Sequence, residues 1–138
     1  MPPRFLMAFD FGLRQIGVAT GNAELKSSQP LTVINARDGI PEWNRVMILL
    51  EEWQPDLLIV GDPLNMDGTA SELALRARKF GQRLHGRFGL PVIMVDERLS
   101  SSEAKQVQRD AGHRGNYKRK PIDAHAAQLI LDTWLREN

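Results

Sequence analysis

The sequence predicts an α/β domain in three layers, in which a five-stranded mixed sheet is covered by helices on both faces. Three apolar segments joined by short turns open the chain, and two further apolar segments alternate with helical patterns behind them. Short turns join antiparallel strands, whereas a helix between two strands produces a parallel pair. The length of 138 residues predicts a single domain over residues 1–138, with a core large enough to fold alone.

The first half of the predicted sheet is antiparallel. Residues 4–10 are predicted to form a strand, and the five consecutive apolar residues 5–9 are typical of a strand buried on both faces. Residues 16–21 are its predicted hairpin partner, and residues 31–35 form a third strand. Gly12 and Gly17 permit a tight bend between the first two strands.

Helices and strands then alternate. Pro41 suits the first turn of a helix that Pro55 ends, and residues 57–60 form a short buried strand. Apolar residues at helical spacing predict the buried face of this helix: Trp43, Val46, Met47, Leu50 and Trp53.

A capping box, Thr69 followed by Glu72, predicts the start of a second helix. Gly89 and Pro91 close this helix, and residues 92–95 form the fifth strand. The predicted apolar stripe of the helix is Leu73, Ala77, Phe80, Leu84 and Phe88.

The last part of the chain is predicted to be helical on both sides of a mobile loop. Ser100 and Glu103 form a second capping box, which starts a third helix. Residues 112–120 are polar and contain two glycines, so we expect a mobile loop there. A final helix is expected from about residue 122 to residue 136.

Composition excludes several classes of protein. The chain has no cysteine, which excludes disulfides, thiol catalysis and cysteine-based zinc sites. Its longest apolar runs, such as residues 46–50, are too short to span a bilayer. The first four residues lack the features of a signal peptide, and we expect a cytoplasmic protein with no membrane partner.

Basic residues gather in two segments. Residues 72–87 and 109–120 each carry five basic side chains and one acidic side chain, in a chain whose net charge is only +1. Two basic segments on an otherwise acidic chain suit a polyanionic partner such as nucleic acid. For either segment alone, a solvated surface is the commoner explanation.

Three acidic residues lie at the ends of predicted elements. Asp10 ends the first strand, Glu97 follows the fifth strand, and Asp123 opens the last helix on its apolar face. Clustered carboxylates are unfavourable unless cations neutralise them, and oxygen-only ligation suits Mg²⁺ or Mn²⁺. Two such ions about 4 Å apart can activate water and stabilise the leaving oxygen of a phosphodiester. Metal-dependent phosphodiester hydrolysis is therefore the expected chemistry, with two ions expected.

Each of these acids also has a purely structural explanation. Asp10 could cap its turn, Asp123 could be a helix N-cap, and Glu97 could pair with Arg98 or Arg14. Only the convergence of all three would distinguish a metal site from these explanations.

Five motifs, in chain order and covering nearly the whole chain, resemble the YqgF family of RuvC-like proteins, also described as Holliday junction resolvases. The resemblance implies an RNase H-like fold and a nuclease that processes the 5′ end of pre-16S rRNA in the bacterial cytoplasm. It also implies that Asp10, Glu97 and Asp123 match the catalytic positions. The motifs are Asp10-Phe11-Gly12, Ile16-Gly17-Val18-Ala19, the run from Pro63 to Thr69, Asp96-Glu97-Arg98-Leu99-Ser100, and Asp123 before Ala126-Ala127.

Asp62 departs from the family pattern, which usually has an apolar residue at this position. It follows the fourth strand, where a carboxylate could be a fourth metal ligand or could be solvated. We expect a solvated side chain.

Six further side chains are expected to contact the substrate. The two arginines could bind phosphates or orient carboxylates, and the side-chain amide of the asparagine could contact a sugar or the backbone. The basic run at residues 118–120 supplies contacts to the nucleic-acid backbone without base specificity. The six are Arg14, Asn65, Arg98, Lys118, Arg119 and Lys120.

Other functions fit parts of the pattern. A sugar-kinase or actin-like ATPase also uses an Asp-x-Gly hairpin, but it needs two such domains with the nucleotide between them. A catalytically idle nucleic-acid-binding module would have no need of three acids that repel phosphates. Cleavage of branched DNA as a Holliday junction resolvase uses the same chemistry on another substrate, and nothing in the sequence separates the two substrates or defines the oligomeric state.

Overall fold

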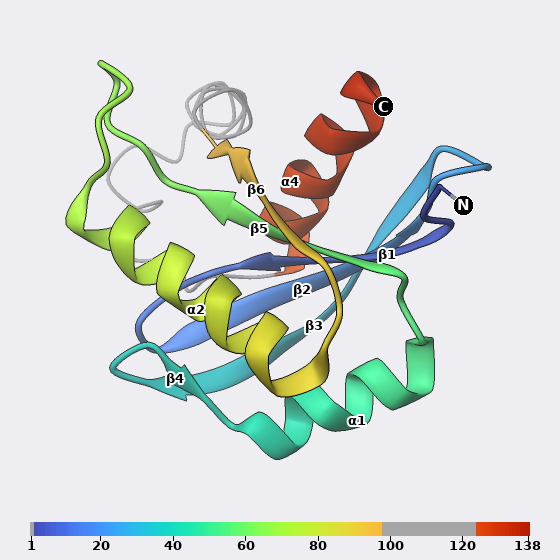
Figure 1. Ribbon diagram of the computed structural model, residues 1–138, viewed down its shortest axis with the longest axis horizontal. Helices are drawn as coiled ribbons and strands as arrows, with labels where there is room; N and C mark the ends of the chain where they lie inside the picture. The colour runs from blue at the N-terminus through green and yellow to red at the C-terminus, as the bar shows by residue number, and fades with distance from the viewer. Residues whose placement is uncertain (1, 98–123) are drawn as a thin grey trace, which may run out of the picture.

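The computed structural model describes residues 2–97 and 124–138. The elements are β1 (Phe5–Asp10), β2 (Gln15–Asn22), β3 (Ser27–Arg37), β4 (Ile40–Pro41), α1 (Trp43–Trp53), β5 (Leu57–Asp62), α2 (Glu72–Phe88), β6 (Val92–Asp96) and α4 (Ala124–Glu137). The strands β1 to β4 come first, and helices and strands alternate from α1 onward, which matches the predicted order apart from the added strand β4 (Figure 1). The third predicted helix, which starts at Ser100, and the loop at residues 112–120 lie outside the described residues.

The strands form one mixed sheet in the order β4-β3-β2-β1-β5-β6. β1, β2 and β3 pair antiparallel, whereas β5 pairs parallel with both β1 and β6. The central strand is therefore β1, and its carboxyl end lies beside the carboxyl ends of β5 and β6. This confirms the predicted change from antiparallel to parallel pairing.

The described part of the sheet has six strands, so the predicted number of five is wrong. The extra strand, β4, is only two residues long and pairs Ile40 and Pro41 with the end of β3. Gly39, whose φ of 81° few other residues adopt, turns the chain back at this point. Pro41 consequently lies in β4, and α1 starts two residues later, at Trp43.

Helices cover both faces of the sheet, as predicted for three layers. On one face Met7 and Phe9 of β1 pack in a core with residues of α1 and α2. On the other face Leu6 and Ala8 pack with residues of α4. Because side chains alternate along a strand, β1 contributes to both cores and is buried on both sides.

The buried faces of α1 and α2 are shifted from the predicted stripes. α1 buries Val46, Leu49 and Leu50 and leaves Met47 41% exposed. α2 buries Ala77, Phe80 and Leu84 as predicted, but Leu73 is exposed and Ala74 and Gly81 are buried instead. Two neighbouring apolar stripes on a helix differ by a shift of one residue. The packing of the helix against the sheet determines which of the two stripes is buried.

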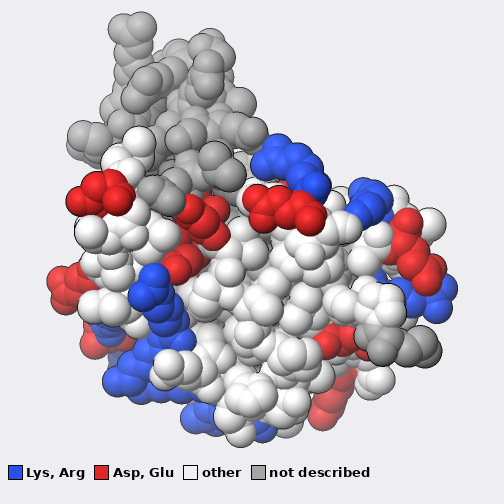
Figure 2. All heavy atoms as spheres, turned by 45° about the horizontal axis from the view of Figure 1, so that its top comes forward, with Lys and Arg blue, Asp and Glu red and all other residues white. Residues whose placement is uncertain are grey.

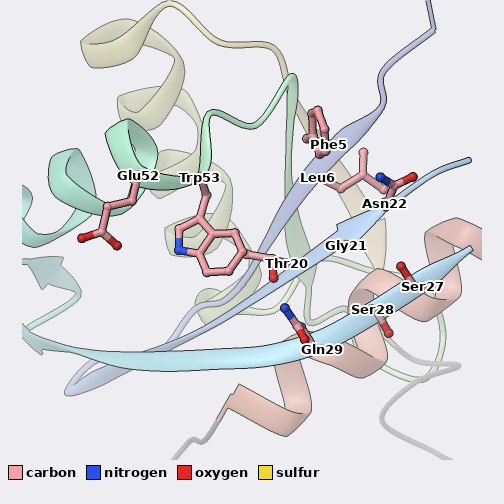
Figure 3. A pocket seen from close by; sticks show the side chains of 10 residues that line it. All are labelled: Phe5, Leu6, Thr20, Gly21, Asn22, Ser27, Ser28, Gln29, Glu52 and Trp53. Carbon is pink, nitrogen blue, oxygen red and sulfur yellow. The ribbon is translucent and has the colours of Figure 1, made fainter. Parts of the chain in front are cut away.

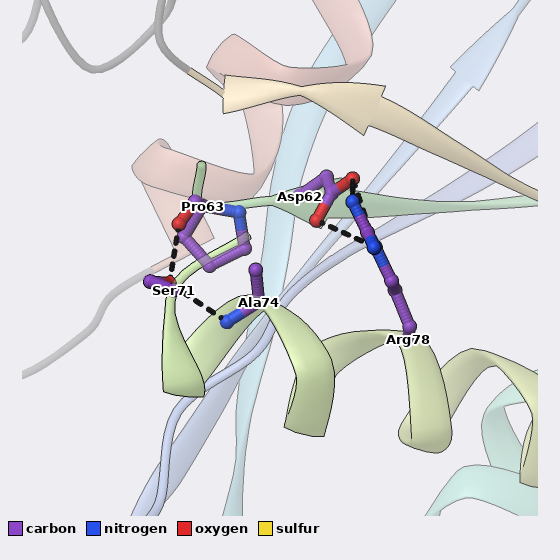
Figure 4. Close-up of polar contacts among 5 residues, drawn as sticks. All are labelled: Asp62, Pro63, Ser71, Ala74 and Arg78. Carbon is purple, nitrogen blue, oxygen red and sulfur yellow. Dashed lines mark hydrogen bonds and ion pairs between the residues drawn. The ribbon is translucent and has the colours of Figure 1, made fainter. Parts of the chain in front are cut away.

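The start of α2 corrects the predicted capping box. Ser71 is the N-cap: its hydroxyl accepts a hydrogen bond from the N–H of Ala74 at 2.9 Å and donates to the carbonyl of Pro63 at 2.7 Å (Figure 4). The hydroxyl of Thr69 instead donates to Asp67 at 2.7 Å. The loop after β5 therefore uses Thr69 for its own turn, and the helix begins two residues later than such a cap would allow.

The ends of the helices otherwise match the sequence. Gly89, with a φ of 71°, closes α2 as expected. α4 runs from Ala124 to Glu137, close to the predicted span of 122–136, of which residues 122 and 123 lie outside the described residues. No helix in the described part of the chain is long and apolar enough to cross a membrane.

Candidate active site at the carboxyl edge of the sheet

The carboxyl ends of three parallel strands meet at one edge of the sheet. Phe9 of β1 is paired with Val60 of β5, so Asp10 follows at the level of Gly61. Gly61 is in turn paired with Val95 of β6. Neighbouring strands lie about 4.8 Å apart, so Asp10 at the end of β1 and the residues that end β6 flank the end of β5.

Asp10 and Glu97 share the face of the sheet that α4 covers. Asp10 is two residues beyond Ala8, and Glu97 is two residues beyond Val95; both apolar residues belong to the core with α4. The side chain of Glu97 also approaches Ile130 of α4 across the position of Gly61. The fold thus brings together two acids that are 87 positions apart in the chain.

Gly61 makes the room for this arrangement. A Cβ atom at this position would lie 2.9 Å from Oε2 of Glu97 and 2.6 Å from Cδ1 of Ile130. Any side chain would therefore have to displace the carboxylate or the helix. The sequence reasoning missed Gly61 as a site residue, although a glycine at the end of a buried strand is a signal of close approach.

The site concentrates negative charge in a buried place. Asp10 is only 8% exposed. The pKa of Glu97 is raised from its ordinary value of 4.5 to about 8, chiefly by burial and then by the negative charges of Asp10, Asp62 and Asp96. Without a cation, Glu97 therefore holds a proton at neutral pH. Oxygen donors crowded in this way fit a hard divalent cation, which would lower that pKa again.

The third predicted ligand, Asp123, lies outside the described residues. The described chain resumes at Ala124, the first residue of α4, and α4 packs on the same face as Asp10 and Glu97. Within residues 2–97 and 124–138, no three His, Cys, Asp or Glu side chains are grouped closely enough to hold a metal ion. The role of Asp123 stays a prediction.

Asp62 is not solvated, and that expectation is wrong. Its side chain is buried on the opposite face of β5, two residues beyond Val60, which belongs to the core with α1 and α2. Arg78 of α2 donates to it from Nη2 at 2.9 Å and from Nε at 3.2 Å (Figure 4). Because side chains alternate along a strand, Asp62 points away from the face that carries Asp10 and Glu97 and toward the guanidinium of Arg78.

The structure places two of the six predicted substrate contacts. Arg14 is exposed in the turn between β1 and β2, at the same edge of the sheet as Asp10. Asn65 lies in the loop after β5, where its side-chain amide donates to Thr69 at 3.0 Å and so stabilises a turn. The other four, Arg98, Lys118, Arg119 and Lys120, lie outside the described residues.

A pocket of about 310 Å³ lies elsewhere in the molecule (Figure 3). It is lined by the first residues of β1, the end of β2, the start of β3 and the last residues of α1. Phe5 begins β1 and Asp10 ends it, so this pocket lies at the opposite end of the strand from the acids. It is not part of the candidate site.

Similarity to known proteins identifies the family of this chain. The model of the family described as "RuvX: Holliday junction resolvase" matches residues 4–137. A protein from Chromohalobacter salexigens is 59% identical over 135 residues, which cover 98% of this chain and 91% of that protein. The chain belongs to the RuvX family. RuvX is the YqgF family that the motifs resemble, so this resemblance is confirmed.

A second relative of this RuvX protein carries the same name as the first. One from Saccharophagus degradans is 51% identical over 138 residues, which cover 100% of this chain and 97% of that protein. Both relatives carry the name "Putative pre-16S rRNA nuclease", and the RuvX family is a family of nucleases. The prediction that the protein is a nuclease is thereby confirmed.

The fold has a solved counterpart. RuvC of T. thermophilus, in complex with a Holliday junction substrate, superposes with a TM-score of 0.56 over 97% of this chain and 94% of that chain. The sequence identity is 16%, so the likeness concerns the fold alone. It confirms the predicted RNase H-like architecture.

Proposed function

We propose that this RuvX protein is a divalent-metal-dependent nuclease that hydrolyses phosphodiester bonds of pre-16S rRNA in the cytoplasm. The observation that carries the proposal is the meeting of Asp10 and Glu97 on one face at the carboxyl edge of the sheet. The elevated pKa of Glu97, caused by burial and by three neighbouring carboxylates, marks this edge as a place where a cation is favoured. The names of the relatives support the choice of substrate.

The donors present fit Mg²⁺ or Mn²⁺. Asp10 and Glu97, joined by Asp123, would hold one or two ions through carboxylate oxygens. When bound, such ions activate a water molecule and stabilise the leaving oxygen of a phosphodiester. The chain itself contributes a rigid strand end that orients Asp10, and the space over Gly61 that positions Glu97 against α4.

Cleavage assays test the proposal. Purified protein is incubated with a pre-16S rRNA fragment and, separately, with a four-way DNA junction, each with Mg²⁺, with Mn²⁺ or with chelator. We expect cleavage of the rRNA fragment with metal and none with chelator. Cleavage of the junction alone would assign the protein to the resolvase alternative, and binding without cleavage of either substrate would make it an idle binding module.

A further inference from the structure

The ion pair between Asp62 and Arg78 leaves part of the guanidinium available. The pair uses Nε and Nη2 of Arg78, and Nη1 makes no hydrogen bond to any residue that the structure describes. The side chain of Arg78 is 41% exposed, whereas that of Asp62 is 11% exposed. Asp62 therefore binds the edge of the guanidinium that carries Nε and Nη2, and the two N–H groups of Nη1 have no hydrogen-bond acceptor among the described residues.

The position of this pair relates it to the candidate site. Asp62 is the last residue of β5 and is paired with Asp96, the residue before Glu97. Its strand also lies between Asp10 and Glu97. If a nucleic-acid strand that reaches the acidic face continues across the end of β5 toward α2, its next phosphates meet the guanidinium of Arg78, which offsets the repulsion from the carboxylates.

Stability alone gives little reason for such a pair. An ion pair whose arginine is 41% exposed adds little net stability, because solvent screens the attraction while the buried carboxylate has lost its hydration. What the pair does supply is orientation, since a guanidinium bound on one edge presents its other edge in a defined direction.

Two further cations continue along α2. Lys79 and Arg83 are exposed, one helical turn apart, and make no ion pair or side-chain hydrogen bond to other described residues. By contrast, Arg76 is paired with Asp38 at 3.1 Å, and the guanidinium of Arg87 lies 4.2 Å from the centre of the Trp43 ring. Figure 2 shows Lys and Arg side chains gathered on the left flank, on the side where α2 lies in Figure 1, close to acidic side chains above them.

We propose that Arg78 positions the substrate by binding a phosphate near the scissile bond while Asp62 holds its guanidinium. Lys79 and Arg83 bind phosphates of the same strand that lie farther from the scissile bond. This inference rests on the proposed nuclease function for its substrate. It assigns the exposed side of α2, from residue 78 to residue 83, as the path of the nucleic acid beyond the acidic site. From Arg78 to Arg83 the helix rises about 7.5 Å, so the three cations lie along one short stretch of α2.

The first experiment measures cleavage of the pre-16S rRNA fragment by Arg78→Lys, Asp62→Asn and the double variant. Each single change should lower kcat/KM about tenfold. Arg78→Lys removes the planar guanidinium, and Asp62→Asn removes the carboxylate that orients it. The double variant should fall no further than the single ones, since both changes break one unit. Losses in kcat/KM that multiply in the double variant would overturn the link between the two residues. A lower melting temperature with unchanged kcat/KM would assign the pair a purely structural role.

The second experiment measures binding of a fluorescein-labelled single-stranded RNA in chelator at several salt concentrations. The double variant Lys79→Gln/Arg83→Gln should reduce the slope of log K against log salt by about 1.4, the value for two lost phosphate contacts on a single strand. Arg45→Gln, which removes an exposed cation from α1, is the matched control and should leave the slope unchanged. An unchanged slope in the α2 double variant would overturn the path along α2.

These outcomes separate the inference from the proposed function, because the binding assay needs no cleavage. If RNA binding depends on α2 but no substrate is cleaved with metal, the path stands and the nuclease proposal fails. If the wild type cleaves RNA and the α2 variants bind and cleave as it does, the nuclease proposal stands and the path fails.

Discussion

The carboxylate of Glu97 lies in the space that Gly61 leaves by having no side chain. A Cβ atom on Gly61 would come within 2.9 Å of Oε2 of Glu97. One acid of the candidate site is therefore positioned by a glycine on the neighbouring strand, with Ile130 of α4 as the other wall.

Gly61→Ala should impair the site more than the fold. The added methyl group clashes with Glu97 and with Cδ1 of Ile130, which should cost about 1–3 kcal/mol of unfolding free energy and move the carboxylate. We expect at least a tenfold loss of metal-dependent cleavage, measured together with urea denaturation. Gly86→Ala is the matched control: a Cβ atom added there would meet no other part of the protein within 4 Å, and Gly86 lies in α2, so the change should stabilise the protein by up to about 1 kcal/mol. Full activity in Gly61→Ala would show that the position of Glu97 does not matter.

Asp10→Asn should abolish metal-dependent hydrolysis while preserving the fold. A neutral amide is a poorer ligand for a hard cation, yet it has the shape of the carboxylate. In chelator the variant should melt at the same temperature as wild type or higher, because the remaining acids repel one another less. Melting temperatures and cleavage rates of both proteins, with Mg²⁺ and with chelator, test this. Cleavage as fast as wild type would remove Asp10 from the catalytic ligands.

The raised pKa of Glu97 predicts a pH-dependent stability in chelator. The folded protein holds the proton up to about pH 8, whereas the unfolded chain releases it near the ordinary value of 4.5. The stability that proton binding to Glu97 contributes is complete below about pH 4.5. It declines as the pH rises above this value and is lost once the pH has passed about 8. Glu97→Gln should therefore gain stability relative to wild type as the pH rises through this window, as measured by urea denaturation. A constant difference between the two proteins would contradict the raised pKa.

Saturating Mg²⁺ is the control for the same experiment. A bound cation favours the ionised carboxylate, so the metal should reduce or reverse the advantage of the Gln variant at high pH. The same measurement on Glu52→Gln, a change of an exposed acid in α1, should show no such dependence on metal.

Ser71→Ala should destabilise the protein by about 1 kcal/mol, the usual cost of losing a helix N-cap. The hydroxyl caps the N–H of Ala74 and also donates to Pro63, so both contacts are lost. Thr69→Ala removes a hydrogen bond in an exposed loop and should cost less. Thermal unfolding of the two variants compares them, and a larger loss for Thr69→Ala would restore the capping box predicted from the sequence.

Much of the fold was predictable because the signals are local. Apolar runs such as Leu57–Val60 and the helix-ending Gly89 lie in short stretches of consecutive residues. Two of the three predicted acids, Asp10 and Glu97, were also recognisable from their places at strand ends. The two-residue strand β4 had no such signal, because its pairing depends on a turn at Gly39 and on the neighbouring β3.

By itself, the sequence determined the order of the elements, the antiparallel and parallel halves of the sheet, and the acids at its carboxyl edge. Only the tertiary structure decided that Asp10 and Glu97 share the face of α4, while Asp62 turns to α2 and pairs with Arg78. The physical reason is that successive side chains of a strand alternate between faces, so a single residue separates the two environments. Strand register sets which residues become neighbours, and it depends on contacts between segments far apart in the chain.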